Sequence, residues 1–197
     1  MSVNKIFTVI GSRGTGKTPL IIGGDFEQGM AKDYLQKGMS TLILDEIDHV
    51  KYRHIPFLHP SKYSQLSTNP GIYRTVTPIQ YLPGLVLDIA RSKLVWNTLL
   101  VLEDCKKYIP QRFRDEAEYT LLGNSKQQNV DLVFMYWAWG IVPPDLMRNT
   151  NYYVIFPTAD HPVVRESYLG GCSEAVFKAH EIVMRGKKPY MVVDSGI

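Results

Sequence analysis

Residues 5–18 read KIFTVIGSRGTGKT, and this stretch decides the fold. KIFTVI is a short β-type run that leads directly into GSRGTGKT, where Gly11, Gly16, Lys17 and Thr18 match the motif G-x-x-x-x-G-K-[ST] in full. A strand, a glycine-rich turn and a helix form the context in which this motif cradles phosphate. Residues 11–18 therefore predict a nucleoside-triphosphate site.

Each part of the motif has a chemical task. Glycines let backbone N–H groups converge on phosphate oxygens, and the N-terminus of the following helix adds its dipole. Lys17 is expected to reach the β- and γ-phosphates, and the Thr18 hydroxyl to ligate Mg²⁺. The predicted nucleotide-binding residues are Gly11, Ser12, Arg13, Gly14, Thr15, Gly16, Lys17 and Thr18.

The composition is that of an ordinary soluble globular protein. The 197 residues suffice for one domain with a sizeable core, and 45% of them are apolar against 21% charged. A net charge of +3 permits a nucleic-acid partner without arguing for one. The longest apolar run, 132–142, is too short to span a bilayer. Cys105 and Cys172 have no metal-ligand spacing, so we expect reduced thiols in an intracellular setting or in a particle assembled there.

Apolar runs alternate with helical patterns along the chain. This order predicts one α/β domain over residues 1–197, with a mostly parallel central sheet flanked by helices. Residues 49–78 contain prolines and many polar residues, so we expect an irregular, exposed excursion with one edge strand at 72–76. Residues 187–197 are expected to be a C-terminal tail. Strands are predicted at 5–10, 41–45, 94–103, 130–137 and 151–157, and helices at about 26–37, 84–93, 112–123 and 173–186.

Two strands end on paired acids that could hold the metal. TLILDEID at 41–48 directly follows the phosphate-loop helix, an early position typical of small GTPases and some kinases. LLVLED at 99–104 leaves room for at least one more strand in between, as in ATPases that use a catalytic carboxylate. We favour LLVLED because of the segment around it.

From 99 to 156 the chain reads as an acid-tipped strand, a helix, a strand beginning with Val-Asp, a turn ending in IVPP, a short helix and the strand YYVIF. This order resembles the FtsK–HerA superfamily of DNA-pumping ATPases. More closely, it resembles the small packaging ATPases of internal-membrane and double-jelly-roll viruses, which are relatives of the poxvirus packaging ATPase. The resemblance covers residues 5–18 and 94–157, and it implies a three-layer P-loop NTPase fold of the RecA-like (ASCE) type.

The resemblance also implies roles for the acids. Glu103 takes the position of the metal-linked acid, together with Thr18, and Asp104 that of the acid that polarises the attacking water. The family more often has Asp before Glu, so either acid could perform either task. Asp45 takes the place of an acid near the nucleotide at the end of the second strand; a solvated strand end is the alternative.

Other functional positions depart from the family pattern or are matched only by position. The γ-phosphate sensor, frequently glutamine, falls here at Tyr136 or Trp137, with Asn149 as a substitute. A cation from a neighbouring subunit is expected to complete the site. Arg148 is the first candidate for that cation because it follows the Pro-Pro turn, and Lys126, Arg112 and Arg114 are the others. Candidate DNA contacts are Arg185, Lys187 and Lys188, which could equally complement the dipole of the preceding helix.

The resemblance implies a hexameric, Mg²⁺-dependent ATPase that drives double-stranded DNA into a preformed viral capsid. Its cofactors would be ATP and Mg²⁺, and its partners DNA, further copies of the chain and proteins of the capsid vertex or portal, in the host cytoplasm or the virion. The alternatives are an assembly or conjugation ATPase of the same superfamily, similar to the zonula occludens toxin group, a small-molecule kinase that uses TLILDEID, and a nucleotide-dependent structural switch within a virion.

Overall fold

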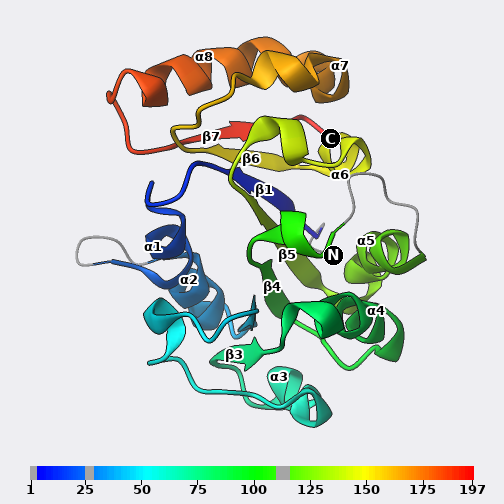
Figure 1. The fold of residues 1–197 in the computed structure, drawn as a ribbon. Helices are drawn as coiled ribbons and strands as arrows, with labels where there is room; N and C mark the ends of the chain where they lie inside the picture. The colour runs from blue at the N-terminus through cyan, green and yellow to red at the C-terminus, as the bar shows by residue number, and fades with distance from the viewer. Residues whose placement is uncertain (1–3, 25–28, 110–115) are drawn as a thin grey trace.

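The computed structural model describes residues 4–24, 29–109 and 116–197. Within these ranges, seven strands form one sheet in the order β3-β2-β4-β5-β1-β6-β7 (Figure 1). Neighbouring strands run parallel except for β6 and β7, which are antiparallel. The predicted α/β fold with a mostly parallel sheet is confirmed. The strands are β1 (Ile6–Ile10), β2 (Ser40–Asp45), β3 (Ile72–Val76), β4 (Thr98–Leu102), β5 (Val130–Tyr136), β6 (Tyr152–Ile155) and β7 (Met191–Asp194).

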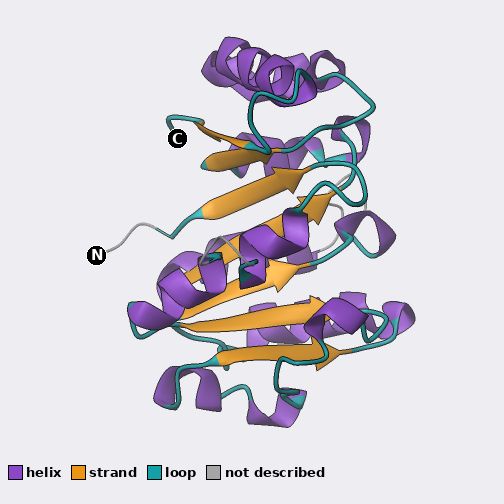
Figure 2. Cartoon of the chain, turned by 90° about the vertical axis from the view of Figure 1, so that its left-hand side faces the viewer, coloured by secondary structure: helices purple, strands orange, loops and turns teal. Residues whose placement is uncertain are grey.

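Helices cover both faces of the sheet, which makes three layers (Figure 2). Leu99 and Val101 of β4 belong to the core with α1 and α2, whereas Leu100 and Leu102 belong to the core on the opposite face, with α4, α5, α6 and α8. Because successive side chains of a strand point to opposite faces, a strand buried on both faces is apolar throughout. The helices are α1 (Lys17–Ile22), α2 (Met30–Gln36), α3 (Gln65–Thr68), α4 (Leu82–Ser92), α5 (Glu116–Gln128), α6 (Pro144–Asn149), α7 (Glu166–Leu169) and α8 (Ser173–Met184).

The excursion at 49–78 is less exposed than predicted. Its edge strand is β3, at the predicted residues 72–76, and the rest consists of 3₁₀ turns and the short helix α3. Residues 56–58 pair with the outer side of β3: the Arg74 N–H donates to the Pro56 carbonyl at 3.0 Å, and the Leu58 N–H to the Arg74 carbonyl at 2.8 Å. Five apolar side chains of the excursion are buried, which polar composition alone concealed. They are Tyr52, Ile55, Leu58, Tyr63 and Leu66.

Residues 187–197 were expected to be a tail, and this expectation is wrong for the part that forms β7. After α8 the chain turns at Gly186, which has a φ of 67°, and returns along β6. Val193 lies in the core, whereas Val192 on the other side of the strand is exposed. The strand has only four residues and follows a basic stretch, so its alternation is too short to stand out in the sequence.

The apolar run at 132–142 forms most of β5 and the turn that follows it. In the described part of the chain, no helix combines the length and hydropathy needed to cross a membrane.

Candidate nucleotide-binding site

The start of the phosphate loop is hydrogen-bonded to the ends of β5 and β6, the two strands that flank β1 in the sheet. It leaves β1 at Ile10, and α1 begins at Lys17. The Gly11 N–H donates to the carbonyl of Tyr136, at the end of β5, at 3.1 Å, and the Ser12 N–H donates to the carbonyl of Pro157, just beyond β6, at 2.9 Å. The start of the loop is therefore fixed to the carboxyl edge of the sheet, where parallel α/β sheets bind their ligands.

Two glycines of the loop are required by geometry. A Cβ on Gly11 would lie 2.4 Å from the Cβ of Phe156, closer than carbon atoms can approach. Gly16 has a φ of 102°, which side-chain-bearing residues rarely adopt. The glycines of the motif thus allow the close approach and the sharp entry into α1 that phosphate binding needs.

Lys17 lies over the loop. Its Nζ donates to the carbonyls of Gly11 and Ser12, the latter at 2.9 Å. Burial lowers the pKa of Lys17, while the nearby acids Glu103 and Asp104 oppose that shift. Since Lys17 carries its ammonium group next to two carboxylates at the loop, it can neutralise phosphate charge without leaving the pocket.

The acids of LLVLED, not those of TLILDEID, face the phosphate loop. Glu103 and Asp104 follow β4. Along the sequence β2 and β3 come between the phosphate loop and β4, so the further strand for which this position leaves room is present, and in the sheet β5 lies between β4 and β1. Both acids line a cavity of about 420 Å³ with the loop. Its lining residues are Arg13, Gly14, Gly16, Lys17, Thr18, Ile47, His49, Lys51, Tyr52, Glu103, Asp104 and Lys107.

The two acids have different surroundings. Glu103 accepts a hydrogen bond from the Tyr52 hydroxyl; burial raises the pKa of Glu103, and the bond from Tyr52 lowers it. Asp104 adopts a φ of 46° and pairs with Lys107 at 3.1 Å. Lys107 also forms an ion pair with Glu46, so it links the loop after β2 to the loop after β4.

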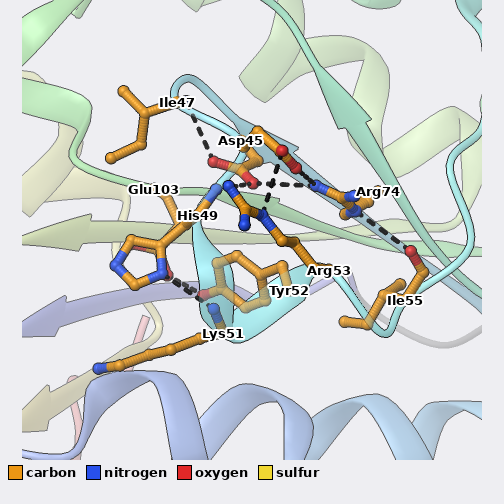
Figure 3. A network of polar contacts seen from close by, with 10 residues as sticks. Asp45, Ile47, His49, Lys51, Tyr52, Arg53, Ile55, Arg74 and Glu103 are labelled. Carbon is orange, nitrogen blue, oxygen red and sulfur yellow. Dashed lines mark hydrogen bonds and ion pairs between the residues drawn. The ribbon is translucent and has the colours of Figure 1, made fainter.

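Asp45, the first acid of TLILDEID, is engaged elsewhere. Its side chain is buried and accepts hydrogen bonds from the N–H groups of Ile47 at 3.2 Å and His49 at 2.8 Å, and it lies 3.6 Å from Arg74 (Figure 3). The alternative of a solvated strand end is wrong. Asp45 organises the loop after β2 and does not line the cavity.

Of the proposed γ-phosphate sensors, the residues at the end of β5 lie nearest the loop. Tyr136 is buried and contacts the loop through its backbone carbonyl, while Trp137 is exposed. Asn149 donates to the Asp145 carbonyl at 2.8 Å and lines a different cavity with Asn4 and Ile6, at the start of β1. Asn149 therefore lies near the amino-terminal end of β1, whereas the phosphate loop of its own chain follows the carboxyl end of that strand.

Of the candidate cations for a neighbouring site, the two that the structure describes, Arg148 and Lys126, do not line the cavity of their own chain. Arg148 pairs with Asp145 at 3.3 Å and lies over the ring of Tyr168, 5.1 Å from its centroid. Lys126 lines the cavity that contains Asn149. Arg112 and Arg114 lie outside the described residues. A role for any of them in a second copy of the chain stays a prediction.

The predicted DNA contacts lie together after α8. Arg185, Lys187 and Lys188 are exposed, and Arg185 is 3.4 Å from Glu181 in the preceding turn. Their exposure suits either a phosphate contact or a dipole interaction, so their role in DNA binding stays a prediction.

Besides Ile47, four residues with polar side-chain groups line the cavity and were not predicted as site residues from the sequence: His49, Lys51, Tyr52 and Lys107. For Lys107 the sequence contains a weak indication of an ion pair, because this lysine lies three residues after Asp104. The others lie in the excursion, and only the path of the chain brings them to the site.

The residues present suit Mg²⁺. Thr18 supplies a hydroxyl oxygen and Glu103 a carboxylate at the same cavity, next to the loop that would hold phosphates. Mg²⁺ prefers such oxygen ligands and is commonly bound by one or two carboxylates together with substrate phosphates.

Comparison with solved structures identifies proteins of the same architecture. The genome packaging NTPase B204 from Sulfolobus turreted icosahedral virus 2, in complex with ATPγS, matches with a TM-score of 0.71 and 16% identity, over 100% of this chain and 94% of that chain. The DNA-packaging ATPase B204 from Sulfolobus turreted icosahedral virus matches with a TM-score of 0.68 and 16% identity, over 100% and 95%. The N-terminal domain of zonular occludens toxin from Neisseria meningitidis matches with a TM-score of 0.50 and 12% identity, over 80% and 79%. No family model and no curated protein matches the sequence. At these identities the likeness concerns the fold: the chain has the P-loop NTPase fold that these viral packaging enzymes share.

Proposed function

We propose that this protein is an ATPase that drives double-stranded DNA into a preformed viral capsid. One observation carries the proposal: the acids that follow β4 face the phosphate loop across the inserted strand β5, in one cavity with Lys17 and Thr18. That arrangement supports a mechanism in which one of these carboxylates polarises a water molecule next to the terminal phosphate. The engagement of Asp45 with Arg74 and two backbone N–H groups argues against a kinase built on TLILDEID.

Hydrolysis would proceed by in-line attack of water on the γ-phosphate. Asp104, which lines the cavity, would orient the water, and Glu103, which lines it together with Thr18, would lie at the metal. Lys17 and an arginine from a neighbouring subunit, with Arg148 as the first candidate, would neutralise the charge that develops. Mg²⁺ held by Thr18 and Glu103 would supply further charge neutralisation at the phosphates.

The resemblance in sequence and fold supports the proposed coupling to DNA. The chain shares its fold with proteins described as a genome packaging NTPase and a DNA-packaging ATPase. We propose a homo-oligomeric ring, a hexamer, that grips DNA through the phosphate backbone and therefore without sequence readout. Arg185, Lys187 and Lys188 would contribute to that grip, and capsid vertex or portal proteins would hold the ring at the particle, in the host cytoplasm or the virion.

The test is ATP turnover with and without double-stranded DNA. We expect DNA to stimulate the wild type, and Glu103→Gln and Asp104→Asn each to abolish most of the turnover. Asp88→Asn makes the same chemical change at an exposed acid on α4 and should leave turnover unchanged. Full activity in both site variants would refute the assignment of the acids.

The DNA response separates this function from its main rival. The likeness to the zonular occludens toxin domain favours, as second candidate, an assembly or conjugation ATPase of the same superfamily. Turnover that depends on Glu103 and Asp104 but ignores double-stranded DNA would support that candidate and refute packaging.

A further inference from the structure

Tyr52 reaches the catalytic acids from a distant part of the chain. Its hydroxyl donates a hydrogen bond to Glu103, which is 51 residues further along the sequence (Figure 3). Burial and the nearby Glu103 raise the pKa of Tyr52, the Thr18 hydroxyl acts in the opposite direction, and Thr18 lines the same cavity. The Tyr52 hydroxyl therefore holds one of the two residues that are proposed to bind the metal, in the cavity that contains the other.

The ring of Tyr52 is held in place independently of its hydroxyl. The side chain is 2% exposed and belongs to the core between the sheet and α1 and α2, with Ile43, Ile55 and Val101. Its aromatic ring also meets that of His49 edge-on, with centroids 6.0 Å apart. Because the ring is fixed by packing, the hydroxyl presents a donor of defined position to Glu103.

The backbone that carries Tyr52 is clamped at both ends by Arg74 of β3. Arg74 forms an ion pair with Asp48 before the tyrosine, and its Nε donates to the Ile55 carbonyl after it at 3.1 Å. Asp45 fixes the start of the same segment through the N–H groups of Ile47 and His49 (Figure 3). The Arg74 side chain is only 11% exposed, so the arginine of this clamp is shielded from water, whereas Asp48 is half-exposed. We name residues 46–55 the clamped segment.

A core tyrosine needs a partner for its hydroxyl, and a backbone carbonyl would serve. Here the partner is Glu103, one of the two acids in the nucleotide cavity. In addition to the packing of its ring, Tyr52 is held by the contacts that Arg74 and Asp45 make with the clamped segment. Groups that hydrogen-bond a metal ligand orient it, and their loss commonly impairs both metal affinity and activity.

We propose that Tyr52 is a positioning residue of the ATPase: its hydroxyl fixes the Glu103 carboxylate beside Thr18, and the clamped segment fixes Tyr52. The inference rests on the proposed function, because it assigns Glu103 to the metal side of that site. It adds a residue from the excursion to the catalytic apparatus, which sequence resemblance does not reach.

The test is Tyr52→Phe, with Tyr63→Phe as its matched control. Both variants remove the hydroxyl of a tyrosine that is 2% exposed in the same excursion, but Tyr63 donates to Thr75 at 3.0 Å, away from the cavity. We measure kcat, KM and the dissociation constant of ATPγS with Mg²⁺ and with EDTA. Tyr52→Phe should lower kcat by about 10- to 100-fold and reduce the gain in ATPγS affinity that Mg²⁺ produces, while the affinity in EDTA is kept. Tyr63→Phe should change none of these.

Two further measurements make the result decisive. In a Glu103→Gln background, Tyr52→Phe should cause no additional loss of the Mg²⁺-dependent gain, because its target is already changed. Asp48→Asn, at a half-exposed side chain, loosens the clamp without touching the core and should reduce the same gain by a smaller factor. If Tyr52→Phe matches Tyr63→Phe in both kcat and the Mg²⁺-dependent gain, the positioning role is refuted. If the wild type hydrolyses no ATP, the proposed function fails, and the affinity measurements still decide whether Tyr52 positions Glu103.

Discussion

Lys107 joins two acids, and the structure indicates which of them matters for stability. Its ammonium group pairs with Glu46 and, at 3.1 Å, with Asp104. The Glu46 side chain is 6% exposed and that of Asp104 34%, so solvent screens the two pairs very differently. We predict that Lys107→Met destabilises the protein mainly by leaving the Glu46 carboxylate buried without its cation.

The magnitude follows from these exposures. The pair with Asp104 resembles a surface salt bridge and contributes about 0.2–1 kcal/mol. Removing one partner of a buried pair costs about 3–5 kcal/mol, and since Lys107 is itself about one-third exposed we expect about 2–4 kcal/mol. In a chain of this size, that loss lowers the melting temperature by roughly 5–15 °C.

Urea unfolding of the nucleotide-free protein, followed by circular dichroism, measures the loss without depending on any activity. Adding Glu46→Gln to Lys107→Met should recover most of the stability, because a neutral amide is cheaper to bury than an unpaired carboxylate. Adding Asp104→Asn should recover little. If Asp104→Asn restores stability and Glu46→Gln does not, the argument from exposure is wrong.

Three further predictions concern the loop, the last strand and a histidine. Gly11→Ala should lower the free energy of unfolding by about 1–3 kcal/mol, because the new Cβ clashes with Phe156. In a thermal-shift assay the same variant should lose the stabilisation by ATPγS. Gly123→Ala, with open space around it, should not destabilise the protein. Val193→Ala should destabilise by about 1–3 kcal/mol in urea unfolding, while Val192→Ala on the exposed side of β7 should stay within about 0.5 kcal/mol; equal effects would contradict the register of β7. Burial lowers the pKa of His180, so on acidification the unfolded chain binds the proton before the folded protein does. The contribution of His180 to the free energy of unfolding should therefore be fully present above the ordinary histidine pKa and decrease as the pH falls below it. In His180→Leu this decrease should be weaker.

The sequence predicted the parts of the site that depend on local pattern. The phosphate loop is recognisable because its glycines and lysine have fixed spacing, and the later acids because they end an apolar strand. In the structure Glu103 and Asp104 of LLVLED, and not Asp45 of TLILDEID, line the cavity with the phosphate loop. The edge strand at 72–76 was also predicted, and it is β3 in the structure.

The rest depends on contacts between distant residues, which no local pattern encodes. Tyr52 is one aromatic residue in a polar, proline-containing excursion, and its place beside Glu103 results from the contacts of Arg74 with Asp48 and Ile55. The burial of Asp45 likewise follows from the turn that its own carboxylate organises. Strand β7 was missed because four residues give too little alternation to distinguish a strand from a tail.

The two margins of the sheet limit how copies of this chain can assemble. At one margin, residues 56–58 occupy the outer hydrogen-bonding groups of Arg74 in β3. At the other, β7 offers only four residues; it follows a stretch with Lys187, Lys188 and Pro189 and ends on the acid Asp194. Charges and proline at a short edge strand discourage the addition of a further strand. Self-association should therefore use side chains on the surface of the molecule rather than a continuous intermolecular sheet. Single substitutions of those side chains should then separate the copies without unfolding the subunits.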